Sequence, residues 1–209
     1  MPTPTQGQTK WMIPSLFGED YVEKIEGILV YQTARGVLWV SDEPVEGTLP
    51  VLISDDLKTA RRVCAVENVP DEMIPVLEDC HIQGDLFDWT ALPYNEWGSG
   101  RNGVGKRAKE QRVLFILRKS DPLPLVVVIQ PGSLKYWRKF IVELTKAGIP
   151  FYRAVISLGL EKAASEDGIT YSRIKPSLVG CLSPEDGLSV KKQFSDSLAR
   201  IARRVSVEE

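Results

Sequence analysis

The chain has 209 residues, a formal net charge of −2 and a pI near 5.6, which excludes a uniformly basic surface, so that nucleic-acid binding would need a local basic patch. Hydrophobic residues make up 43% of the sequence and charged residues 26%, which excludes global disorder. We expect a disordered N-terminus over residues 1–10, followed by a single domain over residues 11–209.

The first half of the chain predicts a β-hairpin and then a long loop. Residues 25–32 and 37–40 are β-branched and aromatic runs that flank a glycine-containing turn, which is typical of a hairpin. Residues 52–66 predict a short strand and a helix around Leu57, Ala60 and Val63. Residues 83–111 combine aromatic side chains with five glycines and predict a long ordered loop of the kind that often carries function.

The second half of the chain predicts more regular elements. Residues 112–118 and 123–130 are apolar runs that predict a buried antiparallel hairpin. A helix with Ser133 as its N-cap should follow and end at Gly148. Residues 151–162 and 169–182 predict a third hairpin with a turn at 165–168. Ser183, Pro184 and two acids then begin a C-terminal helix over residues 184–205.

The fold class expected from this order is mixed and mainly β. It is compatible with an OB-like antiparallel barrel that has a helix between strands 3 and 4, a long loop insertion and a C-terminal helix.

The cysteines and the N-terminus indicate a cytoplasmic protein. Cys64, Cys80 and Cys181 are odd in number and widely spaced, so we expect neither a disulfide framework nor a structural zinc site. The first nine residues have no apolar segment, and we expect no membrane association.

Signatures of catalysis and of cofactor binding are absent from the sequence. His81 is the only histidine and has no metal-site pattern around it. Residues 98–106 resemble a phosphate loop, but Arg107 follows Lys106 where such a loop has serine or threonine. We therefore expect no enzyme, no metal and no cofactor.

Two groups of residues are candidates for binding a nucleic acid. On the glycine-rich loop, Trp97 could stack on a base while nearby cations neutralise phosphates, although a solvated flexible loop explains the same pattern. The cations of this first group are Arg101, Lys106, Arg107, Lys109 and Arg112.

The second group depends on the alternation of side chains along a strand. Tyr171, Arg173 and Lys175 should share one face of the last strand, with Arg153 beside them on the preceding strand. In one interpretation Trp39 extends this binding face of the sheet, and in the other it belongs to the core.

Several motifs resemble a known group of proteins. They are Pro93-Tyr-Asn-Glu-Trp-Gly-Ser-Gly, Gly105-Lys-Arg-Ala-Lys-Glu-Gln-Arg, the following Leu-Phe-Ile-Leu, Pro124-Leu-Val-Val-Val and Ser133-Leu-Lys. Over about Trp11 to Pro184 the chain resembles bacteriophage and prophage single-stranded DNA-binding proteins of OB-fold type. The resemblance implies a role in replication or recombination in a host bacterium.

The chain departs from that group in two respects. Relatives have cysteines in the loop equivalent to 89–108, which implies a zinc knuckle, whereas Trp89, Leu92 and Ala108 stand where thiols are expected, so no metal is carried over. Such binders often end in a long acidic tail, whereas this chain ends in Glu208 and Glu209 alone.

We therefore expect a non-enzymatic single-stranded DNA-binding protein of phage or mobile-element replication or recombination. Replication or recombination proteins would be further partners, and the oligomeric state stays open, with a homodimer as one option. The alternatives are a phage protein-interaction module that inhibits or recruits a host protein, and an enzyme whose acids assemble only in three dimensions.

Overall fold

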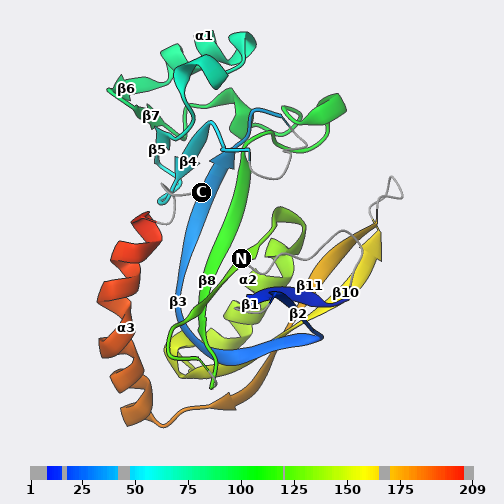
Figure 1. Cartoon of the computed structure of the whole chain (residues 1–209), viewed down its shortest axis with the longest axis vertical. Helices are drawn as coiled ribbons and strands as arrows, with labels where there is room; N and C mark the ends of the chain where they lie inside the picture. Colours follow the sequence, from blue (N-terminus) through cyan, green and yellow to red (C-terminus); the bar gives the residue numbers. More distant parts are fainter. Residues whose placement is uncertain (1–8, 16–17, 42–47, 120, 165–169, 205–209) are drawn as a thin grey trace. The chain divides into compact units, whose positions relative to one another are not determined.

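The computed structural model describes residues 9–15, 18–41, 48–119, 121–164 and 170–204 (Figure 1). The N-terminal residues 1–8, the predicted turn at 165–168 and the acids Glu208 and Glu209 lie outside the described residues. The chain divides into two compact units, a division that the sequence did not predict. The first unit comprises Met1–Gln32 and Arg112–Ala199, and the second comprises Thr33–Gln111 and Arg200–Glu209.

The fold is mainly β with antiparallel strands, as expected, and the described residues form three α-helices, of which α1 (Ile74–Asp79) was not predicted. In the first unit a hairpin of β1 (Trp11–Ser15) and β2 (Gly18–Val22) precedes β3 (Lys24–Leu38). Strands β8 (Lys109–Leu117), β9 (Leu125–Ile129), β10 (Ala154–Ala164) and β11 (Thr170–Cys181) then complete the order β9-β8-β3-β10-β11.

The first unit has the OB-like arrangement of elements. Helix α2 (Pro131–Lys146) lies between β9 and β10 in the chain, that is, between the third and fourth of the five strands. Among the described residues no pairing joins β9 to β11, so β11 has β10 as its only strand partner there. A 3-10 turn (Phe151–Arg153) leads into β10, and helix α3 (Pro184–Arg204) follows β11.

The core of the first unit lies between its sheet and α2. Trp137, Leu134 and Phe140 of α2 pack with Leu114 and Ile156 of the strands. The indole N–H of Trp11 donates to the backbone oxygen of Leu158 at 2.8 Å, so even the buried aromatic of β1 has its polar atom satisfied.

The C-terminus of helix α2 agrees with the prediction, and its N-terminus does not. Gly148 has φ +69°, and the N–H of Ile149 donates to Leu144 O, which closes the C-terminus as predicted. The prediction that Ser133 is the N-cap is wrong, because Gln130 occupies that position and Ser133 is buried inside the helix. The Ser133 hydroxyl instead accepts a hydrogen bond from the N–H of Ile174, at 3.1 Å.

Helix α3 begins as predicted. The N–H of Asp186 donates to Ser183 Oγ at 3.1 Å, and the Ser183 hydroxyl donates to the Asp186 carboxylate at 2.7 Å. Phe194 and Leu198 are buried on one face, at the spacing that the sequence indicated.

The second unit runs in the chain from the C-terminal part of β3 to the first residues of β8. Its elements are β4 (Leu52–Ser54), β5 (Thr59–Arg62), η1 (Val66–Asn68), η2 (Asp71–Met73), α1 (Ile74–Asp79), β6 (His81–Gln83), β7 (Leu86–Asp88), η3 (Pro93–Asn95) and η4 (Arg101–Gly103). Leu38, Leu52, Met73, Phe87 and Trp89 form part of its core.

The predicted hairpin over residues 25–40 is wrong, because this segment is the single strand β3. Gly36 suggested a turn, but it does not have a positive φ. A Cβ at Gly36 would lie 2.3 Å from Cζ2 of Trp89, so the glycine makes room for a buried indole.

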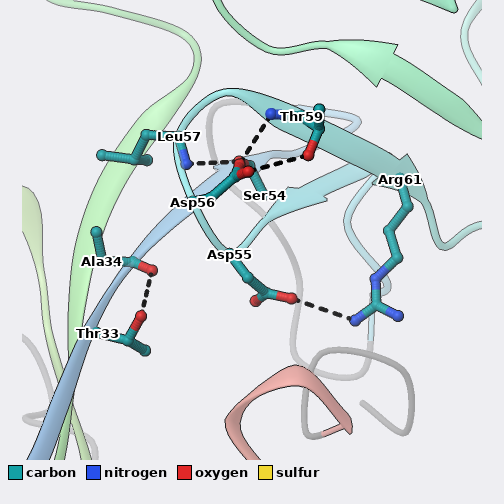
Figure 2. Close-up of polar contacts among 8 residues, drawn as sticks. All are labelled: Thr33, Ala34, Ser54, Asp55, Asp56, Leu57, Thr59 and Arg61. Carbon is teal, nitrogen blue, oxygen red and sulfur yellow. Dashed lines mark hydrogen bonds and ion pairs between the residues drawn. The ribbon is translucent and has the colours of Figure 1, made fainter. Parts of the chain in front are cut away.

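The helix predicted around Leu57 is also wrong. This segment is the hairpin of β4 and β5, and Figure 2 shows its turn. The Asp56 carboxylate accepts the N–H groups of Lys58 and Thr59, both at 2.8 Å, and Ser54 Oγ accepts the N–H of Leu57 at 2.9 Å. These bonds hold Leu57 at φ +59°, where a helix cannot continue.

Candidate nucleic-acid interface

The glycine-rich loop of the second unit is closed by its own hydrogen bonds. We call residues 93–108 the Trp97 loop. The N–H groups of Gly98 and Gly100 both donate to the backbone oxygen of Gly105, at 2.7 and 3.2 Å. The N–H of Ala108 donates to Tyr94 O at 2.9 Å, which joins the two ends of the loop.

Glycine is required inside this loop. Gly98 and Gly105 have φ values of +96° and +71°, a region that other residues enter at a cost. A Cβ at Gly100 would lie 2.3 Å from the oxygen of Val104. The glycines therefore build a defined backbone, as the prediction of an ordered loop implied.

The side chains of Ser99 and Arg107 stabilise the conformation of the loop. The Ser99 hydroxyl lies 2.8 Å from Tyr94 O and accepts the N–H of Arg107 at 3.0 Å. The Arg107 guanidinium lies 5.1 Å from the centre of the Tyr94 ring and donates to Val40 O at 3.0 Å. The carboxylate of Glu72 is 3.9 Å from the same guanidinium.

The outer surface of the loop exposes an indole and two cations. The side chain of Trp97 is 79% exposed, and Val104 is 60% exposed. Arg101 and Lys106 are exposed on the same loop, while the ammonium of Lys109 donates to the backbone oxygen of Lys106. An exposed aromatic face beside cations is the combination that binds an unpaired base together with its phosphates.

Trp39 is half-buried just after β3. Arg112, the last cation of the sequence-predicted loop group, is half-buried and belongs to the first unit.

The face of β11 has the predicted alternation. Tyr171, Arg173 and Lys175 are opposite Ala163, Glu161 and Gly159 of β10, so all project from one face of the sheet. Lys175 is exposed, and Tyr171 is half-buried beside Gly132 of α2.

The charge of Arg173 is matched within the protein. Its Nε–H donates to the Glu161 carboxylate at 2.7 Å, and its guanidinium lies 4.4 Å from the centre of the Tyr136 ring. Arg173 thus contributes less free positive charge to this face than the sequence suggested.

Arg153 lies in the 3-10 turn rather than on a strand and connects the ends of two elements. Its Nε–H donates to the backbone oxygen of Leu182 at 2.9 Å. Its side chain packs against Gly187 of α3, since a Cβ built at Gly187 would lie 2.3 Å from Arg153 Cγ. Arg153 therefore holds the chain where β11 leads into α3.

Two cations that the sequence analysis did not single out lie near Lys175. Lys10 and Lys24 line a cavity with it in the first unit. The proximity of Lys24 to Lys175 depends on the register of β3, β10 and β11, for which the sequence contained no signal.

The second unit also has an apolar cavity of about 350 Å³. Val69, Leu77 and Phe87 line it, with Arg62 and His81 at polar positions. One ring nitrogen of His81 is 2.9 Å from Gly84 O. Burial raises the pKa of the Cys64 and Cys80 thiols, which keeps both protonated at neutral pH.

In the part of the chain that the structure describes, no group of histidine, cysteine and acidic side chains is arranged to hold a metal ion. No helix of that part is long and apolar enough to cross a membrane. Compared with known protein families, curated proteins and solved structures, the chain gives no match.

Proposed function

We propose that the protein binds single-stranded DNA without acting on it chemically, and that it serves phage or mobile-element replication or recombination. The Trp97 loop supplies the main contact: Trp97 stacks on a base, and Arg101 and Lys106 neutralise neighbouring phosphates. The setting in replication or recombination rests on the sequence resemblance described above.

The observation that carries this proposal is the exposure of Trp97 on a loop with a fixed backbone. Because the Trp97 side chain is 79% exposed, the fold lacks the hydrophobic stabilisation that burial of this indole would provide. The hydrogen bonds of Gly98 and Gly100 to Gly105 order the loop in advance, so binding loses little conformational entropy.

A single strand fits this surface better than a duplex. The flat face of an indole stacks on the face of a base, which a duplex covers with neighbouring base pairs. With a net charge of −2, the protein has no general attraction for polyanions, so binding should be local and should weaken as salt rises.

Fluorescence anisotropy with a labelled oligothymidylate, at low and moderate salt, tests the proposal. We expect Trp97→Ala to weaken binding by about 5- to 150-fold, the range for the loss of one stacked base. Leu123→Ala is the matched control, because Leu123 is 72% exposed and lies outside the loop. Equal affinity of the Trp97→Ala variant and the native protein, or affinity that does not respond to salt, would overturn the proposal.

The apolar cavity of the second unit favours a second candidate function, a protein-interaction module. Two of the side chains that line this cavity are exposed apolar groups: Val66 (57%) and Ile74 (37%). A pull-down from host lysate with nuclease treatment separates the two functions, because a protein partner stays bound after the nucleic acid is removed.

A further inference from the structure

The register of three strands in the first unit brings two lysines to either side of a glycine. Gly159 of β10 is paired with Lys24 of β3 and with Lys175 of β11. Side chains of directly paired residues project from the same face of a sheet. Lys24 and Lys175 therefore flank Gly159 with their Cα atoms about 10 Å apart, two strand spacings.

The absence of a side chain at Gly159 leaves this face hollow. The nearest heavy atom to a Cβ built at Gly159 is the backbone oxygen of Lys175, 3.8 Å away. A cavity of about 430 Å³ lies here, and its volume is in the range of ligand-binding sites. Lys10, which precedes β1, is a third lysine in its lining.

The cavity has an excess of positive charge. Its lining contains three lysines and one acid, Glu23. Lys24 is paired with Glu26 at 2.6 Å, but within the described residues Lys10 and Lys175 have no ion-pair partner. Against Glu23 and Glu26, the three lysines leave a net positive charge of about one, which an anion in the cavity would offset.

Hydroxyl groups add donors to these charges. Thr9 and Ser177 line the same cavity, so an oxyanion there could receive hydrogen bonds from hydroxyl and ammonium groups together. A compact ammonium group is well suited to phosphate, which it contacts as a point charge from any direction.

We propose that this cavity, which we call the Lys24–Lys175 cavity, binds a phosphate group. We also propose that the backbone of the bound DNA supplies that phosphate, which rests on the function proposed above. The first unit then contributes an electrostatic contact of its own, separate from stacking on Trp97.

Two substitutions at Gly159 test the cavity while keeping every lysine. Gly159→Glu places a carboxylate between Lys24 and Lys175 and should abolish the phosphate contact. Gly159→Ala is the matched control, because its Cβ meets no atom closer than 3.8 Å and should leave binding unchanged. Thermal melting of both variants shows whether the fold is kept.

A second pair of variants removes charge instead. We expect Lys175→Gln to weaken oligothymidylate binding about 3- to 10-fold at low salt and to reduce the slope of log K against log salt by about 0.7, the value for one phosphate contact to a single strand. Lys162→Gln is the control, because Lys162 is exposed on the opposite face of β10. If Gly159→Glu fails to fold, this pair decides the question.

Titrations with oligothymidylate and with inorganic pyrophosphate separate this inference from the proposed function. Oligothymidylate binding that depends on both Trp97 and Lys175 supports both. Binding that depends on Trp97 but is unchanged in Lys175→Gln and Gly159→Glu overturns the cavity inference alone.

The remaining outcomes concern the source of the phosphate. Pyrophosphate binding that Lys175→Gln removes, without any oligothymidylate binding, supports a small phosphorylated ligand and overturns the DNA assignment. Binding of neither probe overturns both proposals.

Discussion

The guanidinium of Arg107 lies over the ring of Tyr94, 5.1 Å from its centre, and donates a hydrogen bond to Val40 O. An arginine that the sequence suggested as a phosphate ligand thus has partners within the second unit. We infer that Arg107 is a positioning residue, which holds the Trp97 loop in the conformation that presents the indole.

This role predicts different salt behaviour for two adjacent cations. Arg107→Ala should weaken oligothymidylate binding by disordering the loop, with little change in the slope of log K against log salt. Lys106→Gln should reduce that slope by about 0.7, because it removes a phosphate contact. Anisotropy titrations over a series of salt concentrations measure both, and an equal loss of slope in the two variants would contradict the positioning role.

The buried hydroxyl of Ser133 should contribute to stability. Ser133→Ala leaves the N–H of Ile174 without its acceptor, and we expect the free energy of unfolding to fall by about 1–3 kcal/mol. Urea unfolding followed by circular dichroism measures this change. Lys139→Ala, at an exposed position of the same helix, should change the free energy by less than about 0.5 kcal/mol, as surface substitutions do.

The turn between β4 and β5 should make stability depend on acid pH. Partial burial raises the pKa of Asp56, but the N–H groups of Lys58 and Thr59 and the Thr59 hydroxyl outweigh it and hold the pKa below 3.8. Since the pKa is lower in the folded protein, this stabilisation is present above pH 3.8 and is lost as the pH falls through the lowered pKa.

We therefore expect Asp56→Ala to be less stable than the native protein at neutral pH, with the difference shrinking as the pH falls below about 4. Urea unfolding at several pH values measures the difference. Asp20→Ala, an exposed acid outside this turn, is the control. A constant difference between Asp56→Ala and the native protein across the acid range would contradict this reading of the turn.

Gly36 should be intolerant of any side chain. Gly36→Ala places a Cβ 2.3 Å from the Trp89 ring, and we expect a loss of about 1–3 kcal/mol, as for overpacking in other cores. In the double variant with Trp89→Phe, the smaller ring should relieve part of the clash. The loss in free energy of unfolding of the double variant should therefore be smaller than the sum of the losses in the two single variants. Strictly additive losses from urea unfolding would exclude this contact as the reason for glycine at position 36.

The sequence predicted the elements of the second half because their side-chain periodicity is clear. The apolar run at 112–118, the helix that ends at Gly148 and the Ser183 cap all follow from local patterns, and the structure confirms them. Local signals of this kind need no knowledge of distant partners.

The errors arose where a residue serves a distant partner. Gly36 has the local appearance of a turn residue but makes room for Trp89, 53 positions later in the chain. Ser133 has the local appearance of a cap but bonds to Ile174. Trp97 and its cations could be suggested from composition, whereas the Lys24–Lys175 cavity exists only through the register of three strands.

In the middle of the edge strand β11, two successive outward-facing positions offer no backbone donor to another polypeptide. Ile174 directs its N–H away from β10 to Ser133, and Pro176, two residues on and hence facing the same way, has no N–H at all. An open strand edge is a template for pairing with a second molecule, from which aggregates grow. At these two positions the protein instead offers no free backbone donor for edge-to-edge self-association.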